Sequence, residues 1–201
     1  MQIRPYRPGD LADVYDVCVR TGDGGGDARG RYSTDDLTPD IFAGPYVQLE
    51  PEHAFVVDDG TRVVGYVIAT SDSARFARRY RDEWIPSLGE KYRRPPTPAT
   101  TAEDRMLALH FDPDRMVAAE VAAFPAHLHI DLLPESQGQG LGRRLIETLL
   151  DALAAEGVPG VHLVMASSNV KARAFYDHLG FTEVAVPGAE GVDHLVRRTA
   201  R

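Results

Sequence analysis

Residues 126–143 read Ala-His-Leu-His-Ile-Asp-Leu-Leu-Pro-Glu-Ser-Gln-Gly-Gln-Gly-Leu-Gly-Arg, and they decide the fold of the chain. Side chains alternate in the first half, with His127, His129 and Asp131 on one face and Leu128, Ile130 and Leu132 on the other. A period of two is typical of a strand with one buried face. Proline has no backbone N–H to give to a sheet, so regular pairing should fail at Pro134.

A glycine-rich loop and a helix follow this strand. Gly138, Gly140 and Gly142 come first, and the apolar residues after them fall at helical spacing: Leu141, Leu145, Ile146, Leu149, Leu150 and Leu153. The first amides of a helix lack partners and lie at the positive end of its dipole. Glycines let a ligand approach the backbone, and Arg143 and Arg144 add positive charge. The sequence therefore predicts a phosphate-binding loop.

Two common phosphate-binding motifs are excluded. No Gly-Lys-Ser/Thr follows the loop, so it is not a Walker loop. Arg143 and Arg144 follow Gly142, so the third glycine of the dinucleotide-binding fingerprint is missing.

The spacing of Gln137, Gly140 and Gly142 resembles the Gln/Arg-x-x-Gly-x-Gly/Ala signature of the GNAT superfamily of acyl-CoA-dependent N-acetyltransferases. A second segment, residues 169–181, is similar to the next motif of that family. It matches at Asn169, Ala172, Phe175, Tyr176, Leu179, Gly180 and Phe181.

The resemblance implies an α/β fold: one GNAT domain over residues 1–201, with a mixed, mostly antiparallel central sheet flanked by helices. In such folds the fourth and fifth strands splay apart and acyl-CoA inserts between them. Besides the strand that begins the decisive stretch, we expect strands at residues 3–6, 54–57, 62–70, 161–165, 181–186 and 192–198.

Local signals add detail before the second strand. Asp10 is expected to cap the first helix, and a short helix within residues 33–46 is expected to end at Gly44-Pro45. The glycine-rich segment 21–31 fits either a mobile lid or a plain surface loop.

More than fifty residues, roughly 71–125, intervene before the fourth strand and predict a helical insert. The chain also resembles the acetyltransferase-like C-terminal domain of eukaryotic O-GlcNAcases. The matching residues are 3–6, 84–86 and 90–92 in and before the insert, then 124–125 and Asp131. That domain lacks the glycine loop and is regarded as a pseudo-acetyltransferase, whereas the loop is intact here. We expect the insert either to cover the acceptor side, with Trp84 and Tyr92 near substrate or packed beneath it, or to add a remote layer.

By resemblance, the edge of the fourth strand pairs with the pantetheine arm, and an amide near Leu132 or Leu133 would polarise the thioester carbonyl. The residues expected to bind acetyl-CoA are Leu132, Leu133, Gln137, Gly138, Gln139, Gly140, Leu141, Gly142, Arg143, Asn169, Arg173 and Tyr176.

The catalytic candidates are Tyr176, Asp131 and His129. Tyr176 stands at the family's general-acid position, where its phenol could protonate the departing sulfur. Some relatives carry a glutamate base on the fifth strand, but Val164 stands there. Asp131, His129 and His127 then remain as bases, unless their shared face is merely solvated or covered by helices.

Composition limits the remaining functions. With 22 basic and 30 acidic residues the net charge is −8, which disfavours nucleic acid and suits a cationic amine, unless acidity serves only solubility. The single cysteine, Cys18, reads as a core residue, and no His/Cys cluster has metal spacing. No run of about 18 apolar residues and no signal peptide is present, so we expect no membrane span and a cytoplasmic protein.

Two functions fit these features. The first is an acetyl-CoA-dependent N-acetyltransferase in which a primary amine attacks the thioester directly. The second is a catalytically silent acetyl-CoA-binding module, which the O-GlcNAcase resemblance and the missing fifth-strand carboxylate favour. A homodimer is left open.

Overall fold

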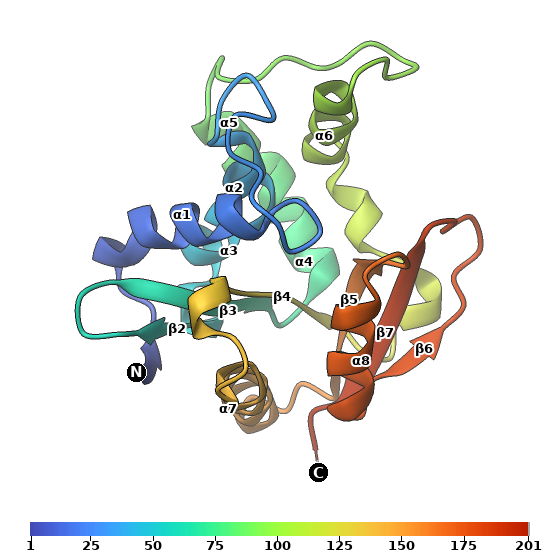
Figure 1. Cartoon of the computed structure of the whole chain (residues 1–201). Coiled ribbons are helices and arrows are strands. Elements are labelled where there is room, and N and C mark those ends of the chain that lie inside the picture. The colour runs from blue at the N-terminus through green and yellow to red at the C-terminus, as the bar shows by residue number, and fades with distance from the viewer. Residues whose placement is uncertain (201) are drawn as a thin grey trace.

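The structure is a computed structural model and describes residues 1–200. Seven strands form one open sheet in the order β1-β2-β3-β4-β5-β7-β6 (Figure 1). Neighbouring strands run antiparallel except β4 and β5, which are parallel. The strands are β1 (Gln2–Pro5), β2 (Ala54–Asp58), β3 (Val63–Thr70), β4 (Ala126–Leu132), β5 (Gly160–Ala166), β6 (Thr182–Val184) and β7 (Val192–Arg198). This confirms the mixed, mostly antiparallel sheet expected from the sequence.

Helices cover both faces of the sheet (Figure 1). One layer holds α1 (Leu11–Thr21), α2 (Leu37–Phe42), α3 (Gly44–Leu49) and α4 (Ser73–Arg79). On the other face α7 (Leu141–Ala155) packs against β2, β3 and β4, and α8 (Val170–His178) lies beside β5. The apolar stripe of α7 is buried against the sheet at Leu145, Ile146, Leu149 and Leu153. Its period of 3.6 residues keeps these side chains on one face.

The insert forms a set of short helices. They are α4, the π-helical turn η3 (Tyr80–Trp84), α5 (Ile85–Ser87), α6 (Ala102–His110), and the 3₁₀ turns η4 (Pro113–Met116) and η5 (Ala119–Val121). α6 begins with a capping box. The Thr101 hydroxyl accepts from the Asp104 amide at 2.9 Å, and the Asp104 carboxylate accepts from the Thr101 amide at 2.9 Å.

Asp40 of α2 holds the insert in place. Its buried carboxylate accepts hydrogen bonds from Lys91 Nζ and from the Tyr92 hydroxyl, both at 2.7 Å. Its backbone carbonyl accepts from Trp84 Nε1 at 2.8 Å. Trp84 and Tyr92 are therefore both fastened to Asp40 in the helical layer, Trp84 to its backbone carbonyl and Tyr92 to its buried carboxylate.

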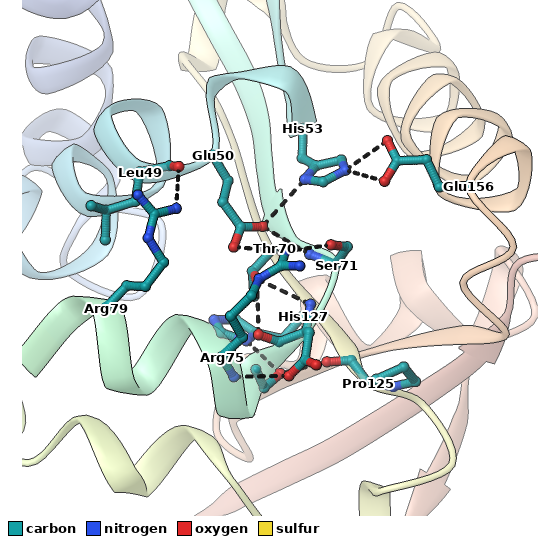
Figure 2. Close-up of polar contacts among 12 residues, drawn as sticks. Leu49, Glu50, His53, Thr70, Ser71, Arg75, Arg79, Pro125, His127 and Glu156 are labelled. Carbon is teal, nitrogen blue, oxygen red and sulfur yellow. Dashed lines mark hydrogen bonds and ion pairs between the residues drawn. The ribbon is translucent and has the colours of Figure 1, made fainter.

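A second buried carboxylate joins the helices to the sheet (Figure 2). Glu50 follows α3 and accepts from the Ser71 amide at 3.1 Å and from Arg75 Nη2 at 3.0 Å. His53 Nδ1 lies 3.3 Å from the same carboxylate, and His53 Nε2 lies 3.0 Å from Glu156, just beyond α7. One network thus links the end of α3, the end of β3, the start of α4 and the end of α7.

Two local expectations are met in part. Asp10 occupies the N-cap position of α1, but its side chain makes no capping bond, because its carboxylate binds the guanidinium of Arg4 at 2.7 Å and the Arg7 amide at 2.8 Å. The helix expected within residues 33–46 is α2, which ends at Phe42, just before Gly44-Pro45. Gly44 and Pro45 also open α3, since proline is tolerated in a first turn where its missing N–H has no partner to lose.

Candidate active site

The strand β4 has a free edge on the side that faces β5. The two strands pair only at Ala126 with Val161 and at His127 with His162. On its other side β4 stays paired with β3 as far as Leu132. The splayed strands that the family resemblance implies are therefore present, and the last five residues of β4 have no β5 partner.

The direction of the β4 backbone groups follows from the ladder. Leu133 N–H donates to the Val64 carbonyl of the β3 side at 3.0 Å, and the Leu133 carbonyl accepts from the Ser136 amide at 2.8 Å. Alternate residues of an antiparallel strand face the same neighbour. Ile130 and Leu132 therefore direct their backbone groups away from β3. Of the two amides considered for the thioester, Leu133's is already engaged, which leaves that of Leu132.

The glycine loop has the geometry that a bound phosphate needs. Gly138 and Gly140 adopt φ of 72° and 73°, a left-handed conformation that side chains disfavour. Both glycines are exposed, and a β-carbon built on either would meet nothing within 4 Å. Leu141 then starts α7, whose first amides have no partner in a preceding turn. Open backbone at a helix N-terminus fits a pyrophosphate.

Several side chains around this loop already have hydrogen-bond or ion-pair partners. Gln137 Nε2 donates to the Leu132 carbonyl at 2.8 Å, and Gln139 Nε2 donates to the Glu135 carbonyl at 3.1 Å. The first bond ties the loop to the end of β4, and the second lies within the turn and loop that follow it. Arg143 is exposed and lies 3.8 Å from Glu147 in an i,i+4 pair, which is weak at a surface, so its charge remains available to an anion.

The two sequence motifs meet at one glycine. A β-carbon on Gly142 would lie 3.1 Å from the ring of Phe175 in α8 and 3.4 Å from the Leu132 side chain. Only a residue without a side chain lets α7, α8 and the end of β4 approach this closely. Gly142 is thus a packing glycine, whereas Gly138 and Gly140 are conformational ones.

Tyr176 follows on α8, and its ring packs edge-on against Phe175 and Phe181. The side chain is buried, yet its hydroxyl has no hydrogen-bond partner within residues 1–200 and is not among the buried polar atoms that lack one. Solvent therefore reaches the hydroxyl. Burial, and then the charge of Asp131, raise the pKa of Tyr176, so the phenol stays protonated at neutral pH.

Asp131 lies on the β4 face that turns toward the α1 layer. Its cross-strand neighbour Tyr66 donates a hydrogen bond to the Asp131 carboxylate at 2.6 Å. Burial raises the pKa of Asp131 to about 6, although the bond from Tyr66 lowers it. A carboxylate with this pKa is ionised at neutral pH and more basic than an ordinary aspartate.

His129 and His127 share that face with Asp131. Burial lowers the pKa of both, that of His129 to about 3, so both rings are neutral at pH 7. A nitrogen this weakly basic takes protons less readily than Asp131 does. Of the three candidates on this face, Asp131 has the electrostatics of a base, and His129 can serve as a neutral hydrogen-bond acceptor.

At the start of α8, Asn169 caps the helix: its side-chain oxygen accepts from the Ala172 amide at 3.1 Å. Its Nδ2 reaches the Gly24 carbonyl at 3.4 Å, which ties the 21–31 loop to this site.

Arg173, also expected to bind acetyl-CoA, lies in a cluster of carboxylates. It pairs with Asp177 at 2.9 Å, Glu183 at 2.7 Å and Asp193 at 3.4 Å. These ion pairs engage Arg173 Nε and Nη1 and fasten α8 to β6 and β7, and they leave Nη2 for an anion.

Three polar residues of this site lie outside the sequence motifs. Tyr66 binds Asp131, while Tyr46 of α3 and Ser73 of α4 bind the histidines of β4. Each is more than fifty residues distant in sequence from its partner. The alternation on β4 predicts a polar face, but the sequence carries no signal for what packs against it.

Comparison with known proteins agrees with this geometry. Residues 26–181 match the sequence model of the acetyltransferase (GNAT) family. The chain belongs to this family. A rat protein O-GlcNAcase is 29% identical over 185 residues, which are 91% of this GNAT chain and 20% of the relative. The chain thus spans about a fifth of the length of these O-GlcNAcases.

Two further proteins match either part or all of this chain. A [ribosomal protein bS18]-alanine N-acetyltransferase of Salmonella typhimurium is 38% identical over 101 residues, 48% of this chain and 64% of that protein. The crystal structure of SsHAT matches all of this chain and 98% of its own at a TM-score of 0.95, with 52% identity.

Two other classes of site were sought in residues 1–200. No helix there is long and apolar enough to span a bilayer. No group of three or more His, Cys, Asp or Glu side chains in the same residues could hold a metal ion.

Proposed function

We propose that this GNAT chain is an acetyl-CoA-dependent N-acetyltransferase that acts on a primary amine by direct attack. The observation that carries the proposal is the free edge of β4, which runs past Asp131 and ends at the glycine loop. The proposal assigns the strand edge to the pantetheine arm, the glycine loop to the pyrophosphate, Asp131 to the base and Tyr176 to the acid. The name of the bS18-alanine N-acetyltransferase, which acts on an amine, supports the same acceptor class.

The residues present fit acetyl-CoA as co-substrate. The exposed amides of the loop and the charge of Arg143 suit its pyrophosphate. The backbone groups of Ile130 suit the amides of its pantetheine arm, which would pair with β4 as a further strand does, and the Leu132 N–H faces the same side. The Leu132 N–H is the donor best placed by the ladder to polarise the thioester carbonyl.

The reaction balances with this chain's own groups. The carboxylate of Asp131 takes one proton from the ammonium, and the freed nitrogen lone pair forms a bond to the acetyl carbonyl carbon. The carbon–sulfur bond breaks, and the electron pair leaves with sulfur, which takes a proton from the Tyr176 phenol. The nitrogen loses a second proton as the amide forms, which restores Tyr176 through solvent. Asp131 then releases its proton.

A screen of primary amines for thiol release from acetyl-CoA tests the proposal. The panel should include polyamines, amino sugars, lysine peptides and peptides with free N-termini. We expect turnover with at least one amine, detected as free thiol and as acetylated product by mass spectrometry. Acetyl-CoA binding by calorimetry without turnover across the panel would contradict catalysis and favour a silent binding module.

A further inference from the structure

A chain of hydrogen bonds runs behind the β4 face from the Pro125 carbonyl to His129. Ser73 Oγ lies 2.7 Å from the Pro125 carbonyl and 2.8 Å from His127 Nδ1. The Tyr46 hydroxyl lies 2.5 Å from His127 Nε2 and 3.0 Å from His129 Nε2. The chain starts from a backbone carbonyl, which can only accept, and this fixes the direction of each bond.

The first two bonds determine the tautomer of His127. Ser73 has one hydroxyl hydrogen, which it donates to the Pro125 carbonyl, so its oxygen accepts from His127 Nδ1–H. A neutral imidazole carries one N–H. His127 Nε2 therefore bears a lone pair and accepts from the Tyr46 hydroxyl.

The next bond determines the tautomer of His129. Because Tyr46 gives its one hydrogen to His127, its oxygen must accept from His129 Nε2–H. Met116 Sδ, at 3.8 Å from the Tyr46 oxygen, is the longer and weaker alternative acceptor. Burial raises the pKa of Tyr46, so the phenol keeps its proton. His129 Nδ1 is left with a lone pair.

The Nδ1 atom of His129 is free to accept a hydrogen bond from a ligand. His129 Nδ1 has no hydrogen-bond partner within residues 1–200, and it is not among the buried polar atoms that lack one. His129 also lies two residues before Asp131, on the same face of β4, so the two side chains are neighbours along the strand.

We infer that Ser73, His127 and Tyr46 are positioning residues that lock His129 as its Nε2–H tautomer, so that Nδ1 always accepts a hydrogen bond from the incoming amine. The inference rests on the proposed function. An ammonium carries three hydrogens and can donate to both His129 and Asp131, whereas a hydroxyl carries one and leaves an acceptor unpaired. An unpaired acceptor is costly, so the lock favours amines over alcohols.

The tautomers can be read directly. Two-bond ¹H–¹⁵N correlation spectra of histidine-labelled protein distinguish Nδ1–H from Nε2–H rings, and His129→Gln and His127→Gln identify the two signals by their loss. We expect Nδ1–H for His127 and Nε2–H for His129 at pH 7. An Nδ1–H pattern for His129 in the wild-type protein would overturn the inference.

The Tyr46→Phe variant tests the function of the lock. It keeps the ring but removes the hydroxyl that orders both histidines. With a responsive amine we expect kcat to fall on the order of tenfold, similar to the loss when the orienting partner of a metal-bound imidazole is removed. The KM for acetyl-CoA should not change, and the His129 signal should show exchange between tautomers.

Tyr80→Phe is the matched control. Tyr80 is as buried as Tyr46 and its hydroxyl lies 2.9 Å from His110 Nδ1, so its loss also removes a buried tyrosine–histidine bond. It should lower thermal stability to a similar degree while kcat and the His129 signal stay as in the wild type. Equal effects of the two variants on kcat would overturn the inference. A wild-type protein without turnover would instead overturn the proposed function, and the spectra would still decide the tautomers.

Discussion

The ring of Phe175 lies 3.1 Å from the point where a β-carbon on Gly142 would stand. These two residues come from separate motifs, one at the start of α7 and one in α8, and their contact holds the glycine loop against the helix that carries Tyr176. The loop proposed to bind the cofactor and the helix that carries the proposed acid are therefore joined by direct packing.

Replacing Gly142 by valine should separate α7 from α8. Its β-carbon and methyl groups would press on Phe175 and on Leu132, and overpacking of this kind costs about 1–3 kcal/mol. We expect a lower melting temperature, measured by calorimetry. The double variant with Phe175→Leu should recover part of the loss, because the smaller side chain gives the valine room. No recovery would mean that the contact is not the source of the strain.

Gly140→Asp should weaken acetyl-CoA binding. It places a side chain and a negative charge where the pyrophosphate is expected, at the first amides of α7. We expect affinity to fall at least tenfold, about 1.4 kcal/mol, by calorimetry.

Gly188→Asp is its control. Gly188 has a φ of 76° and equally open surroundings, but it lies in the loop between β6 and β7. The two variants share the backbone strain of a non-glycine residue in this conformation, so only the position of the charge differs. Similar loss of affinity in both would contradict the placement of the cofactor.

Some parts of the site could be predicted from the sequence, because they are determined by residues close to one another in the chain. The strand, the loop glycines and the Asn169 cap each depend on residues close in sequence. The ion pairs of Arg173 could not be predicted, because its carboxylate partners on β6 and β7 become neighbours only after folding.

The polar partners of β4 could not be predicted for the same reason. Tyr46, Ser73 and Tyr66 reach Asp131 and the histidines from other elements. Alternation with a period of two predicts which side chains share a face of the strand. Tertiary packing determines which residues contact that face.

The rate should depend on the ionisation of Asp131. Burial raises its pKa to about 6, and a general base acts only when deprotonated. With an amine whose own pKa exceeds 9, log(kcat/KM) should therefore show an inflection near pH 6, with activity lost as the pH falls below it. Asp131→Asn should remove this inflection and lower the rate. Persistence of the inflection in that variant would assign it to another group.

The raised pKa of Asp131 also predicts that removing its negative charge stabilises the folded chain. The pKa of Asp131 in the folded chain lies above the ordinary value of 3.8, so ionisation costs folding free energy as the pH rises from about 4 through 6. Asp131→Asn is neutral at every pH and can still accept from Tyr66. It should melt higher than the wild type at pH 7.5, with the difference vanishing near pH 4. A lower melting temperature at pH 7.5 would show that the ionised carboxylate stabilises the fold.

Tyr176→Phe should lower the maximal rate without affecting binding. The substitution keeps the ring contacts with Phe175 and Phe181 and removes a hydroxyl that has no partner within residues 1–200. Stability and acetyl-CoA affinity should therefore survive. A positioned proton donor contributes on the order of a hundredfold, so kcat and kcat/KM should fall together by about that factor. Single-turnover kinetics would expose the chemical step if product release limits kcat. An unchanged single-turnover rate would leave Tyr176 a packing residue and move the proton donor elsewhere.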